Sequence, residues 1–97
     1  MLTYQFVLPE KIVSQEFLED LAYAHGGFTS WKAEDVWVDG TRHTVGEAVR
    51  VFQVSTVDYA ELIYRVRQQA ENAGEQALYF GQVGEHRVID LRAGGAA

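Results

Sequence analysis

Two segments of this chain have the periodicity of amphipathic helices, and each lies between segments that alternate like strands. In residues 15–25 and 59–73 the apolar side chains recur every three or four positions, which places them on one helix face. The resulting order is strand, helix, strand, strand, helix, strand. This order limits the chain to a few small folds in which two helices pack on one sheet.

Capping signals mark the ends of both helices. Ser14 precedes the first helix, and Asp58, paired with Ser55, precedes the second, at positions whose side chains accept a backbone hydrogen bond. The glycines at 26–27 and Gly74 follow the last periodic residues, where a left-handed residue ends many helices. We therefore expect both helices to begin and end at these residues.

The first strand is predicted over residues 2–9 because polar and apolar side chains alternate there and Pro9 cannot continue a ladder. The alternation assigns one face of this strand to the helices and the other to an open side of the sheet. The face toward the helices holds Tyr4, Phe6 and Leu8, and the open face holds Thr3, Gln5 and Val7.

Residues 28–38 predict a twisted second strand, joined to the third by the pair Asp39-Gly40, which is typical of a two-residue hairpin turn. Gly46 predicts a bulge early in the third strand. Residues 48–54 are apolar in both alternating sets, which indicates a strand at the centre of the sheet.

The C-terminal part predicts a fourth strand over residues 77–83 and a turn at Gly84-Glu85. A fifth strand is possible over residues 86–91. Residues 92–97 are small and aperiodic, which indicates a flexible tail.

The first four strands and both helices, over about residues 2–83, resemble the ferredoxin-like topology. The resemblance implies an α+β two-layer sandwich in which both helices cover one face of an antiparallel sheet. At 97 residues, the chain is expected to form one domain over residues 1–97.

Composition narrows the possible partners. The net charge is −6 and the basic residues are scattered, which argues against binding to nucleic acid or an anionic membrane. The chain has no cysteine, so disulfides and cysteine-based zinc sites are excluded. The sequence contains no long apolar run of the kind that would indicate a signal peptide or a membrane span. We expect a cytoplasmic protein without a cofactor or a metal site.

The open face of the sheet is predicted to be partly apolar, because Val7, Val49 and Val51 face away from the helices. Exposed apolar surface of this kind marks an interface or a ligand groove. A homo-oligomer, with a dimer as the first hypothesis, is therefore expected. The alternative is a monomer whose open face is covered by the fifth strand and the tail.

Five residues are candidates for contact with a small ligand: His43, Glu47, Trp37, Tyr79 and Gln53. A bulge at Gly46 would turn His43 and Glu47 toward one polar pocket beside a tryptophan, with imidazole as base and carboxylate as its orienting partner. Tyrosine and glutamine side chains within apolar strands need hydrogen-bond partners, which a ligand or a second copy would supply. No residue is assigned a catalytic role.

Three functions remain open at this point. The first is a non-catalytic binding or interaction protein that self-associates through the open face. The second is an enzyme or small-molecule-binding protein of the dimeric α+β barrel type, acting on a small metabolite with His43, Glu47 and Tyr79. The third is an acidic inhibitor or regulator that offers Glu34, Asp35 and Asp39 to a basic protein partner.

Overall fold

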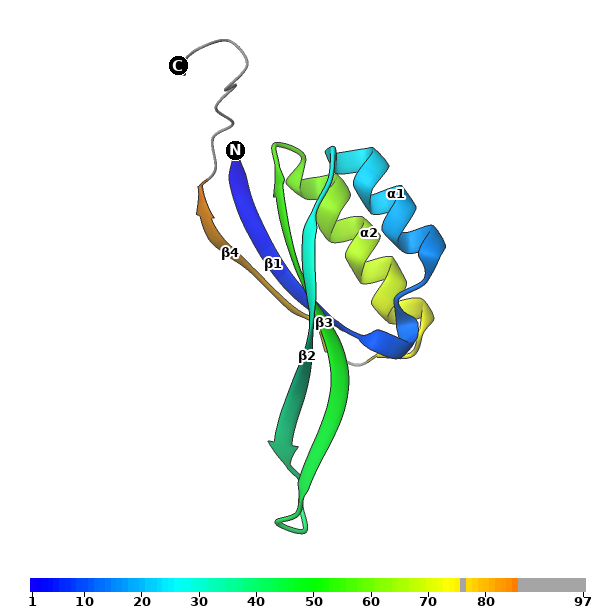
Figure 1. Cartoon of the computed structure of the whole chain (residues 1–97), viewed down its shortest axis with the longest axis vertical. Coiled ribbons are helices and arrows are strands. Elements are labelled where there is room, and N and C mark those ends of the chain that lie inside the picture. The colour runs from blue at the N-terminus through cyan, green and yellow to red at the C-terminus, as the bar shows by residue number, and fades with distance from the viewer. Residues whose placement is uncertain (76, 86–97) are drawn as a thin grey trace.

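The computed structural model describes residues 1–75 and 77–85, which form an α+β sandwich of one sheet and two helices (Figure 1). The predicted fold class is confirmed. The possible fifth strand and the predicted tail lie outside the described residues. The elements are β1 (Leu2–Pro9), a 3-10 turn (Glu10–Ile12), α1 (Gln15–His25), β2 (Thr29–Val38), β3 (Thr44–Thr56), α2 (Tyr59–Asn72) and β4 (Tyr79–Glu85).

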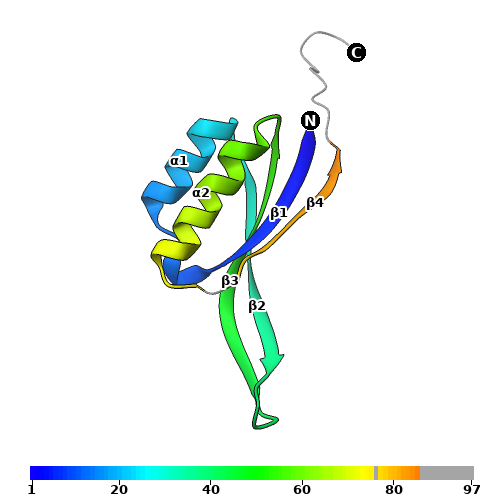
Figure 2. The ribbon, with the colours of Figure 1, turned by 180° about the vertical axis from the view of Figure 1, so that it is seen from behind.

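The four strands are all antiparallel and lie in the order β2, β3, β1, β4. Both helices cover the same face of this sheet, and the other face is open (Figures 1 and 2). The central strand β3 pairs with β1 from Thr56, opposite Leu2, to Val49, opposite Pro9. The run of residues that is apolar in both alternating sets therefore does lie at the centre of the sheet, as predicted.

Three phenylalanines hold the core between the sheet and the helices. Phe6 and Phe52 are fully buried on neighbouring strands, and their rings stack with centroids 4.8 Å apart. Phe80 stacks on the other side of Phe6 at 5.9 Å. The helices cover this row with Leu21 and Leu62, both fully buried. The predicted inward face of β1 is thus confirmed.

The helix caps form at the predicted Ser14 and Asp58, but Ser55 takes no part in the second cap. The Ser14 hydroxyl accepts a hydrogen bond from the backbone N–H of Phe17 at 3.0 Å, and Asp58 accepts one from Glu61 at 3.1 Å. Gly26 ends α1 in the left-handed conformation, with a φ of 79°. Neither helix in the described residues is long and apolar enough to cross a membrane.

The ribbon, which we define as residues 34–38 of β2 and 44–48 of β3, projects beyond the other two strands (Figure 1). It exists because β1 ends at Pro9, opposite Val49, whereas β2 and β3 continue to pair as far as Val38 and Thr44. At about 3.3 Å per residue, five further pairs carry the ribbon roughly 16 Å past the end of β1.

The turn at the end of the ribbon differs from the predicted two-residue turn. The Asp39 N–H donates to the carbonyl of His43 at 2.9 Å, and the Arg42 N–H donates to the carbonyl of Asp39 at 3.1 Å. The loop therefore contains three residues, Gly40 to Arg42, and Arg42 is left-handed with a φ of 67°. The Asp39 carboxylate favours this loop because it accepts the N–H groups of Thr41 and His43.

The predicted bulge at Gly46 is wrong. Gly46 pairs with Val36 in an uninterrupted ladder, and its backbone needs no positive φ. A glycine removes a side chain without adding a residue, so the register can continue through it. The register shift in the sheet lies instead between Thr3 and Tyr4 in the pairing of β1 with β4. The predicted turn at Gly84-Glu85 is also wrong, because β4 extends through both residues.

The left-handed residue at the tip of the ribbon gives a test of the turn. Arg42→Gly should be more stable than Arg42→Ala by about 0.5–1 kcal/mol, because only alanine keeps a Cβ in the left-handed conformation. Urea unfolding of both variants measures the difference. An alanine variant as stable as the glycine variant would contradict the three-residue loop.

Candidate functional site

The open face of the sheet carries one apolar row across all four strands. Trp31 on β2, Val51 on β3, Val7 on β1 and Tyr79 on β4 are neighbours in the pairing register. Val51 is 9% exposed even in the single chain, whereas Trp31 is 43% and Tyr79 72% exposed. The aliphatic middle of the row is therefore nearly buried, and the aromatic side chains at its two ends are exposed.

A shallow depression of about 250 Å³ lies on this face. Its floor is aliphatic, one side is the Tyr79 ring, and residues 34 and 35 of β2 lie at the other end, with Asp35 on the open side of the sheet. The lining residues are Val7, Ala33, Glu34, Asp35, Val49, Val51 and Tyr79. An aromatic wall over an aliphatic floor suits an apolar group, either of a ligand or of another protein chain.

The polar residues of the open face pair with one another toward the opposite end of the sheet. The Gln53 amide donates to the Gln5 amide oxygen at 3.0 Å, and the hydroxyls of Thr3 and Ser55 lie 2.7 Å apart. Each pair joins residues that are opposite in the ladder between β1 and β3. Gln53 therefore has a partner within its own chain, although its other polar atoms stay free to meet a ligand.

The structure does not bring the five predicted ligand residues into one pocket. Tyr79 and Gln53 lie on the body of the open face, and Trp37 and Glu47 lie on the same side of the sheet within the ribbon. His43 lies in the turn, where its Nδ1 is 2.7 Å from the Thr41 hydroxyl. His43 and Glu47 are four residues apart on a regular strand, about 13 Å, so they form no imidazole–carboxylate pair.

Ion pairs fix the base of the ribbon to the 3-10 turn after β1. The Arg50 guanidinium donates two hydrogen bonds to the Glu10 carboxylate, at 3.0 and 2.7 Å. The Lys11 ammonium is 3.9 Å from Glu47. Hydrogen bonding from Arg50 lowers the pKa of Glu10, and hydrogen bonding from Thr41 likewise lowers the pKa of Asp39 at the tip.

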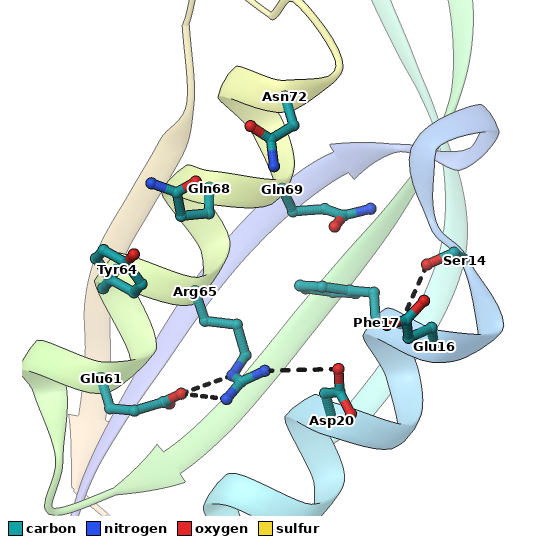
Figure 3. Close-up of a pocket in the computed structure, with 10 residues that line it drawn as sticks. All are labelled: Ser14, Glu16, Phe17, Asp20, Glu61, Tyr64, Arg65, Gln68, Gln69 and Asn72. Carbon is teal, nitrogen blue, oxygen red and sulfur yellow. Dashed lines mark hydrogen bonds and ion pairs between the residues drawn. The ribbon is translucent and has the colours of Figure 1, made fainter.

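A polar groove of about 320 Å³ lies between the two helices, on the far side of the sandwich from the open face (Figure 3). Arg65 crosses it. Its Nε and Nη2 are 2.7 and 2.5 Å from Glu61, and its Nη1 is 3.9 Å from Asp20 on α1. The groove is lined by Ser14, Glu16, Phe17, Asp20, Glu61, Tyr64, Arg65, Gln68, Gln69 and Asn72.

The sequence contains one signal for this groove, the four-residue spacing of Glu61 and Arg65 on one helix face. The approach of Asp20 could not be predicted, because it depends on how the two helices pack. In the described ranges, no three histidine, aspartate or glutamate side chains are arranged to hold a metal ion.

His25 is fully buried at the junction of α1, β3 and α2. Its Nδ1 lies 2.8 Å from the Thr56 hydroxyl, and its Nε2 is hydrogen-bonded to the Glu61 carboxylate. The Thr56 oxygen also accepts the N–H of Asp58 at 3.0 Å. The sequence places His25 in the last turn of α1 but contains no local signal for either partner.

Comparison with known proteins identifies the fold but no family. No protein-family model and no curated protein matches the sequence. Among solved structures, the PII-like protein CutA from Nostoc sp. PCC 7120, in its apo form, is similar with a TM-score of 0.57 and 14% identity, over 96% of this chain and 85% of that one. The GlnK–ATP complex of B. subtilis is similar with a TM-score of 0.56 and 10% identity, over 97% of this chain and 92% of that one.

The ion pair at the base of the ribbon predicts a pH response of Glu10. Because Arg50 favours the carboxylate, the titration midpoint of Glu10 should lie below the ordinary glutamate value of about 4.3. Arg50→Gln should raise it toward that value, as measured by NMR of the carboxyl carbon. The stability from this pair is present above the ordinary pKa and is lost as the pH falls through the lowered one.

Arg67→Gln is the matched control for this titration, since Arg67 pairs with Glu71 on the exposed side of α2. It should leave the Glu10 midpoint unchanged. An unshifted midpoint in the Arg50 variant would show that the guanidinium does not hold Glu10 in solution.

Proposed function

We propose that this protein is a non-catalytic binding module that works as a homo-oligomer, its copies joined through the open face and the ribbon. The ribbon is the observation that carries this proposal. A two-stranded hairpin alone is at best marginally stable in water, and no third strand pairs with these residues within the described part of the chain. A second copy of the chain is the occupant that would always be present to cover it.

The ribbon presents apolar side chains on both of its faces. Trp37, 43% exposed, and Val45 lie on the side continuous with the open face, whereas Val36 and Val38, 55% and 65% exposed, lie on the other. Two copies that pack open face to open face would cover only the first pair. A head-to-tail arrangement covers both sides, and such a contact closes into a ring when its rotation allows.

This arrangement differs from the face-to-face dimer that was the first hypothesis. The ribbon of one copy would lie against the open face of the next, where the row from Trp31 to Tyr79 offers an apolar surface. Each copy would then give one ribbon and receive another. The interface would bury the apolar surface that a single chain leaves in water.

A small molecule bound where two copies meet is the second part of the proposal. The depression beside Tyr79 is the proposed pocket. The proposed contacts to the ligand are Gln53 from the open face of one copy and Trp37, Glu47 and His43 from the ribbon of its neighbour. The similar GlnK structure is a complex with ATP, which supports a ligand-binding role for this fold. The carboxylate of Asp35 beside the depression favours a neutral or cationic ligand here.

The other two hypotheses have less support. An enzyme with His43, Glu47 and Tyr79 as its polar groups needs these side chains in one cavity, and a single chain keeps them apart. An inhibitor that uses Asp39 would compete with the turn for this carboxylate, because its Oδ1 accepts three hydrogen bonds there.

Sedimentation at micromolar concentration tests the assembly. Wild-type protein should sediment as an oligomer, and Trp37→Glu should dissociate it, with a rise of at least about 30-fold in the dissociation constant if Trp37 is a central contact. Tyr23→Glu is the matched control, because Tyr23 is 95% exposed on α1, away from the open face. A wild-type protein that is strictly monomeric would overturn the proposal.

Val36→Glu separates the two arrangements. In a head-to-tail ring this substitution on the second side of the ribbon should weaken assembly as strongly as Trp37→Glu does, because both sides are covered. In a face-to-face dimer only the Trp37 variant should dissociate, and that pattern would contradict the ring.

A further inference from the structure

The buried junction around His25 has a defined order of hydrogen-bond donors and acceptors. The Asp58 N–H donates to the Thr56 oxygen, so the Thr56 hydroxyl proton remains for the nearest acceptor, Nδ1 of His25. Nε2 of His25 faces a Glu61 oxygen, and a carboxylate only accepts. Every donor and acceptor in this row of hydrogen bonds has a partner if the imidazole is neutral and carries its one proton on Nε2.

We propose that this junction is a proton-sensitive latch, closed while His25 is neutral and opened when the ring takes up a second proton. A proton on Nδ1 reverses the bond to Thr56, whose hydroxyl must then find another acceptor. Thr56 is only 6% exposed, and the described part of the chain offers its hydroxyl no other acceptor. A buried O–H without an acceptor is destabilising, as is a charged ring removed from water.

The charged groups around the latch do not remove this conflict. Oε2 of Glu61 faces His25 directly, while two nitrogens of Arg65 bind the other oxygen, Oε1, so neither oxygen is an acceptor for the Thr56 hydroxyl. Asp20 on α1 lies beyond Arg65, at 3.9 Å. Asp58 approaches Thr56 with its backbone N–H, and its carboxylate caps α2 through Glu61 N–H.

The latch lies where β2 and β3, the two strands that continue into the ribbon, connect to the helices. His25 is the last residue of α1 and connects through two left-handed glycines, Gly26 and Gly27, to β2, whereas Thr56 is the last residue of β3. Opening the junction therefore frees the helix-side ends of β2 and β3, the two strands that continue into the ribbon. If the proposed assembly exists, acid should weaken it through this junction, and this last step alone rests on the proposed function.

The experiment compares wild type with His25→Gln, which keeps one donor toward Glu61 and one acceptor for Thr56 but cannot take up a proton. Between about pH 8 and pH 5, the range in which imidazoles titrate, the melting temperature of wild type should fall by at least about 4 °C more than that of His25→Gln. His43→Gln, in the exposed turn, is the control and should behave like wild type.

Imidazole ¹⁵N NMR at neutral pH gives a second measurement that does not require the variant to fold. The proposal expects the neutral ring with its proton on Nε2. A charged imidazolium at neutral pH, or equal pH dependence of melting in wild type and His25→Gln, would overturn the latch. Both measurements hold for a monomer as well as an oligomer, so a failed latch and a failed assembly are distinguishable.

Discussion

The length of β3 is the constraint on which the rest of the structure depends. This strand has 13 residues, and β1 pairs with only the last eight, from Val49 to Thr56. The part paired with β1 holds Phe52 at the centre of the core. The remaining part, which pairs only with β2, becomes one strand of the ribbon. One strand thus belongs both to the sandwich and to a hairpin with which no further strand pairs in the described residues.

The two ends of the part of β3 that pairs with β1 are fixed by polar contacts of different kinds. At the ribbon end, Arg50 and Glu10 form an ion pair beside the last ladder pairs of β1. At the other end, Thr56 joins His25 and, through it, Glu61 in a buried chain of hydrogen bonds. Buried polar chains require every partner, whereas a surface pair tolerates loss. The helix-side end is therefore the more sensitive of the two.

The sequence predicts the body of the fold better than the ribbon. Alternation in residues 2–9 correctly assigned the core face of β1, because a buried face fixes its own register. The turn was wrong because Asp39 bonds to later backbone groups, which a dipeptide rule does not consider. The bulge at Gly46 was wrong because a glycine removes a side chain without adding a residue to the strand. The partners of His25 lie 31 and 36 residues away in the sequence, so no local pattern contained them.

The central claim is that the ribbon is covered by another copy of the chain, and amide hydrogen exchange of residues 34–38 and 44–48 tests it most directly. In the described residues, the outer edge of β2 and the edge of β3 that faces away from β2 are unpaired along the ribbon, so the N–H groups on these two edges of an isolated ribbon should exchange almost as fast as those of an unfolded peptide. The account predicts slow exchange at micromolar concentration that becomes faster on dilution. Fast exchange at every concentration, with the core strands protected, would contradict it.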